Sequence, residues 1–287
     1  MKIVSLNIEQ LLYSALTYIK TRSFVLVYCL PLTTLLIQSC FQNITAQGSA
    51  TTTTIKQKSI SKTGQQKEKV VEIGYYDRYE TLPKFHLDTA SEEDFLLQPS
   101  RSTFKKEKLH MEKGFFSIPI ENRQTRFKAY DENNGEDGLN GNEYLGYDNS
   151  LKLYAIQQNS VSESLGFAEM NLIHSGTGYH YRIISLGDWS VSLPVPSINN
   201  MYMVYWQNPE YESKTLSIAV LKINTKAPYR NLLKEYTSCF TDNGLSIEEI
   251  RWKDNNHFFI KAYTSSLDGQ GDEFRTYSYF NAKINNK

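Results

Sequence analysis

The sequence lacks a charge imbalance. Its 287 residues include 31 Lys and Arg and 31 Asp and Glu, so the formal net charge is zero. A chain without net charge has no global field that would attract the phosphates of DNA or RNA. Nucleic acid is therefore not an expected partner. The hydrophobic fraction of 40% and the charged fraction of 22% are ordinary for a globular protein.

Patterns for metal-dependent or covalent catalysis are also missing. The five histidines form no His-Glu-x-x-His zinc pattern and no cluster with cysteine. The stretch HSGTGYH, residues 174–180, is not a G-x-S-x-G nucleophile elbow, and its glycines favour a hairpin turn. We therefore expect no cofactor, and a protein that binds rather than catalyses. Acids such as Asp268 and Asp272 would serve glycoside hydrolysis only if the fold gave them the required separation.

The apolar run nearest the N-terminus is too short for a simple transmembrane helix. It extends from Ser23 to Ile37, about fifteen residues, whereas a bilayer core needs roughly twenty. Lys20 and Arg22 precede it, and a small residue follows near its end. Basic, then apolar, then small is the order typical of a secretory signal peptide.

The end of this run, Ile37-Gln38-Ser39-Cys40, resembles the lipobox of bacterial lipoproteins. That motif has an aliphatic residue three positions before a cysteine and a small residue directly before it. The resemblance covers residues 20–40 and implies that residues 1–39 are a signal peptide with an N-terminal extension. It also implies cleavage before Cys40 and acylation of its thiol and new amino group, palmitate being a typical acyl chain. An ordinary signal peptide with a chance cysteine is the alternative.

The residues after the lipobox predict a lipid-anchored envelope protein. Residues 40–70 are rich in Thr, Ser, Gln and Lys and have few large apolar side chains, so we expect a flexible tether. In lipoproteins an acidic residue directly after the cysteine can signal inner-membrane retention, whereas this chain has Phe41. The resemblance thus implies the periplasmic face of the outer membrane. After cleavage Cys239 would have no cysteine partner except Cys40, which would carry lipid.

Residues 71–287 are predicted to form a mostly β exported domain, because apolar and polar residues alternate along most of it. Three turn–strand units begin at Tyr147, Ser197 and Trp252, about fifty to fifty-five residues apart. Each places Asn, with Asp or a second Asn, in a turn before an aromatic strand, and a second strand follows. The pattern is loosely similar to propeller blades. We therefore expect blade-like antiparallel repeats, in an incomplete propeller or a sandwich.

One short helix is predicted near residues 229–240. It would follow Pro228 and end before Gly244, which are start and stop signals. Apolar residues recur at helical spacing within it: Leu232, Leu233, Tyr236, Cys239 and Phe240. Cys239 would then lie on the apolar stripe as a buried, unreactive thiol.

The candidate binding residues come from an unusual aromatic content, 20 Tyr and 14 Phe. If the last two predicted strands pair, aromatic side chains flanked by Lys and Arg would share one face of a sheet: Phe259, Tyr263, Tyr277 and Tyr279. Aromatic residues with Arg are enriched where proteins bind one another, which favours a protein partner in, for example, an inhibitor or immunity-type role. Tyrosine rings also stack on sugars, so a glycan-binding or glycan-cleaving protein is the alternative. These aromatics would otherwise cover the core.

Six acids lie between residues 131 and 148, and carboxylates are ligands that calcium prefers. The acids do not follow the spacing of a calcium-binding loop in any register. A solvated loop is therefore expected, and no metal site is predicted. If calcium did bind here, Asp131 and Asp137 would be its candidate ligands.

The lipobox resemblance predicts that membrane attachment depends on Cys40. Cells that express the wild type should incorporate a clickable fatty acid into the protein, whereas the Cys40→Ala variant should not, because the acyl acceptor sulfur is gone. The Cys239→Ala variant controls for loss of a cysteine as such and should be labelled normally. Equal labelling of wild type and Cys40→Ala would refute the lipoprotein assignment.

Overall fold

A computed structural model of the chain describes residues 69–162, 165–187, 189–210 and 213–285. The predicted signal peptide, Cys40 and nearly all of the predicted tether lie outside these residues. The first described strand, β1 (Val70–Ile73), begins one residue before the predicted start of the exported domain. Within the described ranges, every helix is too short or too polar to cross a membrane.

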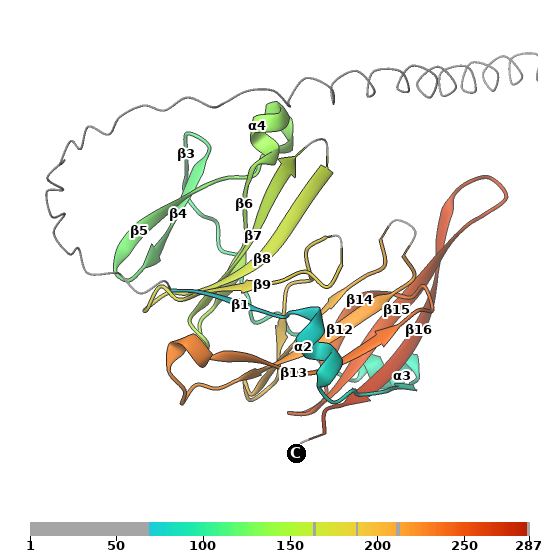
Figure 1. Cartoon of the computed structure of the whole chain (residues 1–287). Helices are drawn as coiled ribbons and strands as arrows, with labels where there is room; N and C mark the ends of the chain where they lie inside the picture. Colours follow the sequence, from blue (N-terminus) through green and yellow to red (C-terminus); the bar gives the residue numbers. More distant parts are fainter. Residues whose placement is uncertain (1–68, 163–164, 188, 211–212, 286–287) are drawn as a thin grey trace, which may run out of the picture. The chain divides into compact units, whose positions relative to one another are not determined.

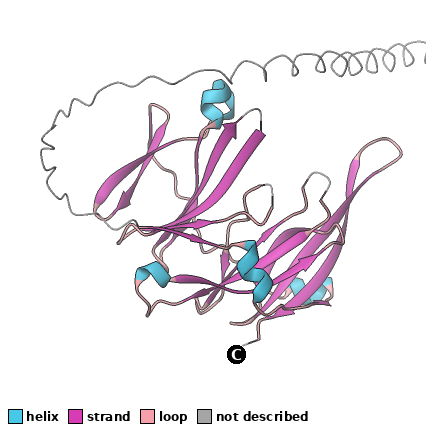
Figure 2. Cartoon of the chain, in the orientation of Figure 1, coloured by secondary structure: helices cyan, strands magenta, loops and turns pink. Residues whose placement is uncertain are grey.

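The domain is mainly β, which confirms the predicted fold class (Figures 1 and 2). Its strands form four sheets, numbered here I to IV in chain order. Sheet I contains β3 (Met111–Glu112), β4 (Phe115–Ile120) and β5 (Arg123–Lys128). Sheet II contains β6 (Gly141–Asp148), β7 (Leu153–Ser162), β8 (Leu165–His174) and β9 (His180–Ile183). Sheet III contains β10 (Val195–Pro196), β11 (Tyr202–Gln207), β12 (Leu216–Ile223) and β13 (Leu233–Thr241). Sheet IV contains β14 (Ser246–Trp252), β15 (His257–Leu267) and β16 (Glu273–Lys283).

Each sheet is an antiparallel meander in which every strand pairs with the next one along the chain. Two N-terminal strands join sheets that form from later residues. Strand β1 adds to sheet II in parallel with β9, and β2 (Leu87–Thr89) pairs antiparallel with β16 in sheet IV. The N-terminal segment therefore ties the second sheet to the last one.

The three predicted turn–strand units are structural repeats, since each turn joins the first two strands of a sheet. In each turn an Asp or Asn side-chain oxygen accepts a hydrogen bond from a backbone N–H group, and the acceptors are Asp148, Asn199 and Asp254. Asp148 Oδ1, for example, lies 2.9 Å from the backbone nitrogens of Ser150 and Leu151. Such side chains reproduce the turn's own hydrogen bonds, which explains why Asn and Asp mark the start of each repeat.

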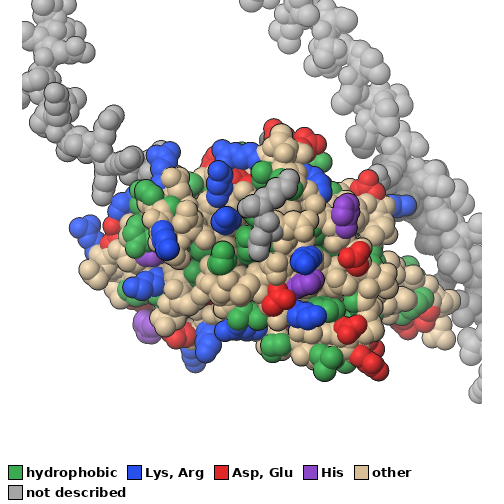
Figure 3. Space-filling model, turned by 90° about the horizontal axis from the view of Figure 1, so that it is seen from below, with side chains coloured by type: hydrophobic (Ala, Val, Ile, Leu, Met, Phe, Trp, Pro, Cys, Tyr) green, Lys and Arg blue, Asp and Glu red, His purple; other side chains and the backbone are tan. Residues whose placement is uncertain are grey.

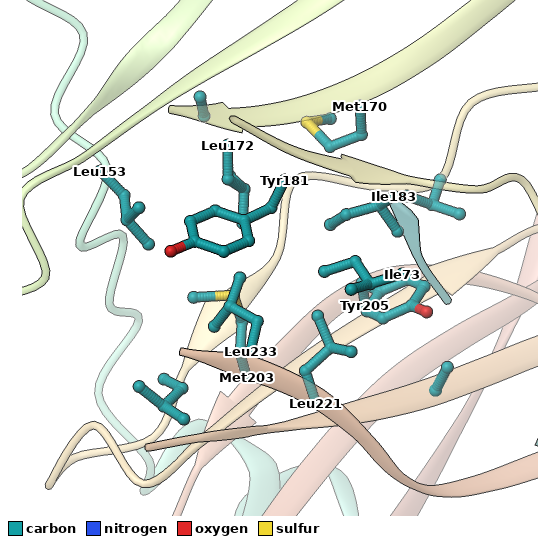
Figure 4. Close-up of a cluster of buried hydrophobic side chains, with 14 of the residues drawn as sticks. Ile73, Leu153, Met170, Leu172, Tyr181, Ile183, Met203, Tyr205, Leu221 and Leu233 are labelled. Carbon is teal, nitrogen blue, oxygen red and sulfur yellow. The ribbon is translucent and has the colours of Figure 1, made fainter. Parts of the chain in front are cut away.

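Successive sheets pack face to face through buried clusters. One cluster joins sheets I and II and includes Ile118 and Ile156, and another joins sheets III and IV and includes Val220 and Ile260. Figure 4 shows the cluster between sheets II and III, where Leu172 and neighbouring side chains of sheet II face Tyr205 and its neighbours from sheet III. Among the described residues none of the three clusters joins sheet IV to sheet I, so the blade-like series is open.

The helix predicted near residues 229–240 is wrong. Only Tyr229–Asn231 forms a single 3₁₀ turn (η2), and the following residues form β13, which pairs with β12. The β12–β13 register shifts between Val220 and Leu221, which are opposite Thr237 and Glu235, so Tyr236 is an extra residue. Such a bulge interrupts the period-two alternation of a strand, and the apolar residues then imitate a helical spacing. The helices of the described residues are short: α2 (Tyr76–Thr81), α3 (Glu92–Leu96), α4 (Gly135–Leu139) and η1 (Glu132–Asn134).

Cys239 is buried, as predicted, but on a strand rather than on a helical stripe. Its partner in the register is Ile218 on β12. Burial raises the pKa of the Cys239 thiol, because the thiolate would lose its hydration. A buried thiol with a raised pKa is a poor nucleophile.

Gly74 directly follows β1, and its backbone approaches sheet III so closely that there is no room for a side chain. A Cβ at this position would lie 2.8 Å from the Tyr205 hydroxyl oxygen and 3.2 Å from Ile183 Cγ2. The Tyr205 hydroxyl donates to the Tyr79 hydroxyl at 3.0 Å, and both phenols are fully buried. The glycine thus leaves room for a buried hydrogen bond that joins α2 to sheet III.

We predict that Gly74→Ala strongly destabilises the domain. Both Gly74 (φ +88°) and Gly271 (φ +90°) have left-handed backbone conformations, but nothing lies within 4 Å of a Cβ at Gly271. Gly271→Ala should therefore cost about 1–2 kcal/mol, which is the backbone strain alone. Gly74→Ala should cost about 1–3 kcal/mol more, because the methyl group overpacks the core. Urea unfolding of the two variants measures this difference, and equal destabilisation would contradict the packing argument.

Candidate functional site

The surface of the domain mixes charges of both signs. On the face shown in Figure 3, Lys and Arg side chains are interspersed with Asp, Glu and apolar side chains. Binding must therefore depend on local groups of side chains rather than on net charge.

The two strands that carry the candidate aromatics pair along their full length, as the sequence analysis required. In the antiparallel β15–β16 register, Tyr263 is opposite Tyr277 and Lys261 is opposite Tyr279. Their neighbours Ile260 and Ala262 point the other way and are buried against sheet III. We call the outward set, Lys261, Tyr263, Arg275, Tyr277 and Tyr279 together with Glu248, the aromatic face.

Cations lie over two of the tyrosine rings. Lys261 Nζ is 4.2 Å from the centre of the Tyr277 ring, and the guanidinium carbon of Arg275 is 4.3 Å from that of Tyr263. The two rings have their centres 6.2 Å apart in an edge-to-face arrangement. Cation–π contacts of this kind are worth about 0.5–1 kcal/mol each at exposed sites, so they order long side chains before any partner binds.

Glu248 joins these groups. The β14–β15 register shifts between Ile247 and Glu249, and this bulge makes Glu248 the extra residue on β14. Its carboxylate accepts from Lys261 Nζ at 2.6 Å and from the Tyr277 hydroxyl at 2.8 Å. The hydrogen bond from Lys261, followed by that from Tyr277, lowers the pKa of Glu248, while the same contact raises the pKa of Lys261.

Two of the four candidate aromatics are less accessible than the sequence suggested. Phe259 is only 7% exposed and is not available for surface contacts. Tyr279 lies beside α3: its ring centre is 5.6 Å from that of Phe95, and its hydroxyl donates to Glu92 at 2.7 Å. Tyr263 is half-buried and Tyr277 is 41% exposed, so these two carry the accessible ring surface.

Beyond Tyr263 the β15–β16 hairpin extends past its neighbouring strands and forms an arm, which is visible at the right of Figure 1. Strand β14 pairs with β15 only as far as Tyr263, and β2 pairs with β16 only from Phe280 onwards. The arm exposes two large apolar side chains that sequence reasoning did not select, Leu267 (71%) and Phe274 (49%). Both residues lie next to the turn between two predicted strands. This position could have indicated their exposure, because the end of a hairpin has no neighbouring strand to cover it.

The acidic loop has a local structural role at one of its two candidate positions. Asp131 Oδ1 accepts from the backbone N–H of Asn133 at 3.0 Å and so caps the 3₁₀ helix η1. Asp137 belongs to α4, and its side chain lies outside the described part of the structure. In the described ranges no group of three or more His, Cys, Asp or Glu side chains is arranged to hold a metal ion.

The contacts of Glu248 predict a pH-dependent contribution to stability. A carboxylate whose pKa is lowered from 4.5 by its folded surroundings stabilises the fold above that pH, and the contribution is lost as the pH falls through the lowered pKa. Glu248→Gln should therefore be less stable than wild type near neutral pH and similar to it in acid. Guanidinium unfolding at several pH values measures this. Glu273→Gln, which alters an exposed carboxylate 3.9 Å from Arg275, should change stability little at any pH.

A destabilisation of Glu248→Gln that does not vary with pH would show that the loss comes from packing and not from ionisation.

The accessible site consists of Tyr263 and Tyr277, the ion pairs around Glu248, and Leu267 on the same face of the arm. Phe274 is exposed on the other face of the arm. Comparison of the chain with protein-family models, with curated proteins and with solved structures finds no match.

Proposed function

We propose that the chain is a lipoprotein of the bacterial cell envelope whose β domain binds a protein partner through the aromatic face and the arm. The observation that carries this proposal is the exposure of Leu267 and Tyr277, which lie on the same face of one projecting hairpin in the β15–β16 register. Exposed apolar residues gathered on one element and bordered by polar groups are typical of protein-binding surfaces.

The side chains of the aromatic face are already ordered without a partner. Tyr277 is held by a hydrogen bond from its hydroxyl to Glu248 and by the ammonium group of Lys261 over its ring. Binding costs less conformational entropy when the contacting side chains keep the geometry they already have. Tyrosine and arginine are also the residue types that most often dominate the energy of an interface.

The lipid anchor rests on the lipobox resemblance of residues 37–40 and on the basic and apolar segment before it. Acylation of Cys40 would attach the chain to a membrane, and the residues up to about 70 would separate the domain from the lipid surface. Phe41 supports the periplasmic face of the outer membrane. An inhibitor or immunity-type role is one form that such partner binding would take.

Glycan binding is the second candidate, because the exposed ring of Tyr277 offers a stacking surface. Glycan cleavage has less support. A general acid for glycoside hydrolysis needs a raised pKa, whereas the pKa of Glu248 is lowered by Lys261. Asp268 is likewise held ionised, since backbone N–H groups of the arm's turn donate to it and lower its pKa.

We predict that Tyr277→Ala abolishes most of the partner binding. Affinity capture from envelope extracts with wild type and variants, followed by titration of the purified partner, measures the effect. Affinity should fall by at least about tenfold, because a central tyrosine of an interface is typically worth more than 1 kcal/mol. Tyr76 is a matched control, as it is 42% exposed but belongs to α2 and contacts Phe240 of sheet III.

Tyr76→Ala should bind the partner as the wild type does. Equal loss in both tyrosine variants, or no loss in either, would contradict a binding role for the aromatic face. A glycan that binds the wild type but not Tyr277→Ala, with no protein partner captured, would establish the second candidate instead.

A further inference from the structure

A cavity of about 850 Å³ lies between the edges of sheets II and III, on elements separate from the aromatic face. One wall is β1, from Val70 to Ile73, and the other is the start of β13 with the preceding turn η2. Within the described chain each of these strands is the last one of its sheet at this edge. The cavity is therefore bordered by the outer edge of β1 and by the start of β13. Further along β13, Ser238 forms an isolated bridge with Lys84.

The backbone of the β1 wall presents hydrogen-bonding groups to the cavity. The carbonyl groups of Lys69 and Ile73 accept from β9 and from the residue that follows it, so the alternate residues Val70 and Glu72 direct their N–H and C=O groups away from sheet II. The N–H of Gly74, next in this series, donates across the gap to Glu235 Oε1 at 2.8 Å. The edge of β1 thus already makes one such bond to the opposite wall.

The acidic side chains that line the cavity have ion-pair partners, whereas three of the basic ones have none within the described part of the chain. Glu235 pairs with Arg78 at 3.2 Å, and Glu72 pairs with Arg182 at 3.1 Å. The remaining cations of the lining are Lys222, Arg230 and Lys234. None of these three has an ion-pair partner among the described residues, so the cavity carries a local excess of positive charge.

Two of these cations occupy opposite positions on neighbouring strands. Lys222 and Lys234 are directly opposite in the β12–β13 register, and both are exposed. Lys222 Nζ lies 5.4 Å from the centre of the Tyr236 ring. Like charges at directly opposite positions of an antiparallel pair repel, and a bound anion would offset that repulsion. The same two lysines also line an adjoining cavity of about 490 Å³ beside Pro83 and Tyr236. Lys222 and Lys234 therefore line both cavities.

We propose that this cavity binds an acidic segment of a protein in extended conformation. The segment would add as a strand to the free edge of β1, using the N–H and C=O groups of Val70 and Glu72. Side chains alternate along a strand, so acidic residues at every second position would all face Lys222, Arg230 and Lys234. This site is independent of the aromatic face, because the two share no residue.

The test uses a fluorescein-labelled ten-residue peptide of alternating Glu and Val, titrated with the purified full-length chain in mild detergent and followed by fluorescence anisotropy. The double variant Lys222→Ser/Lys234→Ser should bind at least about tenfold more weakly, because two charge pairs are lost. Lys214→Ser/Lys253→Ser removes two exposed lysines that do not line the cavity and should bind like wild type. Tyr277→Ala should also bind this peptide normally, which separates the result from that of the aromatic face.

Two further probes test the peptide's conformation and class. A peptide with the same charges but methylated on alternate backbone nitrogens should bind poorly, because it cannot donate to the edge of β1. A galacturonate oligomer of equal charge should bind more weakly than the peptide, because it has no strand geometry. Equal binding of the methylated peptide, tighter binding of the galacturonate oligomer, or unchanged affinity in the lysine double variant would each overturn the proposal.

The double variant should fold about as stably as wild type, because the like-charge repulsion that it removes and the Lys222–Tyr236 cation–π contact that it loses are both small at exposed positions. Thermal unfolding followed by circular dichroism checks this. A marked loss of stability would contradict the premise that both effects are small. A Lys-Val peptide that bound as well as the Glu-Val peptide would contradict the charge argument in the same way.

Discussion

The rest of the structure depends on the burial of sheet III on both of its faces. Met203 on β11 and Leu221 on β12 pack against sheet II. Their neighbours on the same strands, Val204 and Val220, pack against sheet IV. A sheet covered on both sides must be apolar at successive positions, which is how the sequence of β11 and β12 reads. Because sheet III contributes to both interfaces, the blades on either side of it are held in chain order.

This central burial restricts where function can lie. The faces of sheet III are inaccessible, so binding groups must occupy the outer face of an end sheet or the edges between sheets. The aromatic face lies on the outward side of sheet IV, where Glu248 orders Lys261 and Tyr277. The charged cavity lies at the edges of β1 and β13. The aromatic face depends on a β-bulge at Glu248, and the charged cavity depends on the outer edge of β1.

The local sequence pattern was sufficient to predict the structure where residues close together in the chain decide the conformation. Asp148 and Asp254 accept backbone hydrogen bonds within two or three residues of themselves, so their turns were readable from the sequence. Alternation placed Tyr263 and Tyr277 on one face on the condition that their strands pair, and the strands do pair. The pattern failed at β13, where a bulge beside Tyr236 disturbs the period, and at Phe259, where alternation predicts the face but cannot predict what covers it.

The sequence by itself determined the β class of the domain and the turns that begin the blade-like repeats, because these depend on alternation and turn chemistry over short distances. It left open whether the tyrosines of sheet IV face outward, because alternation does not tell which face of a sheet is covered. Only the tertiary structure decided that Phe95 and Glu92 approach Tyr279, and that β1 lies opposite β13. These contacts join residues far apart in the chain. They depend on how whole sheets pack, a property that no local pattern of side chains records.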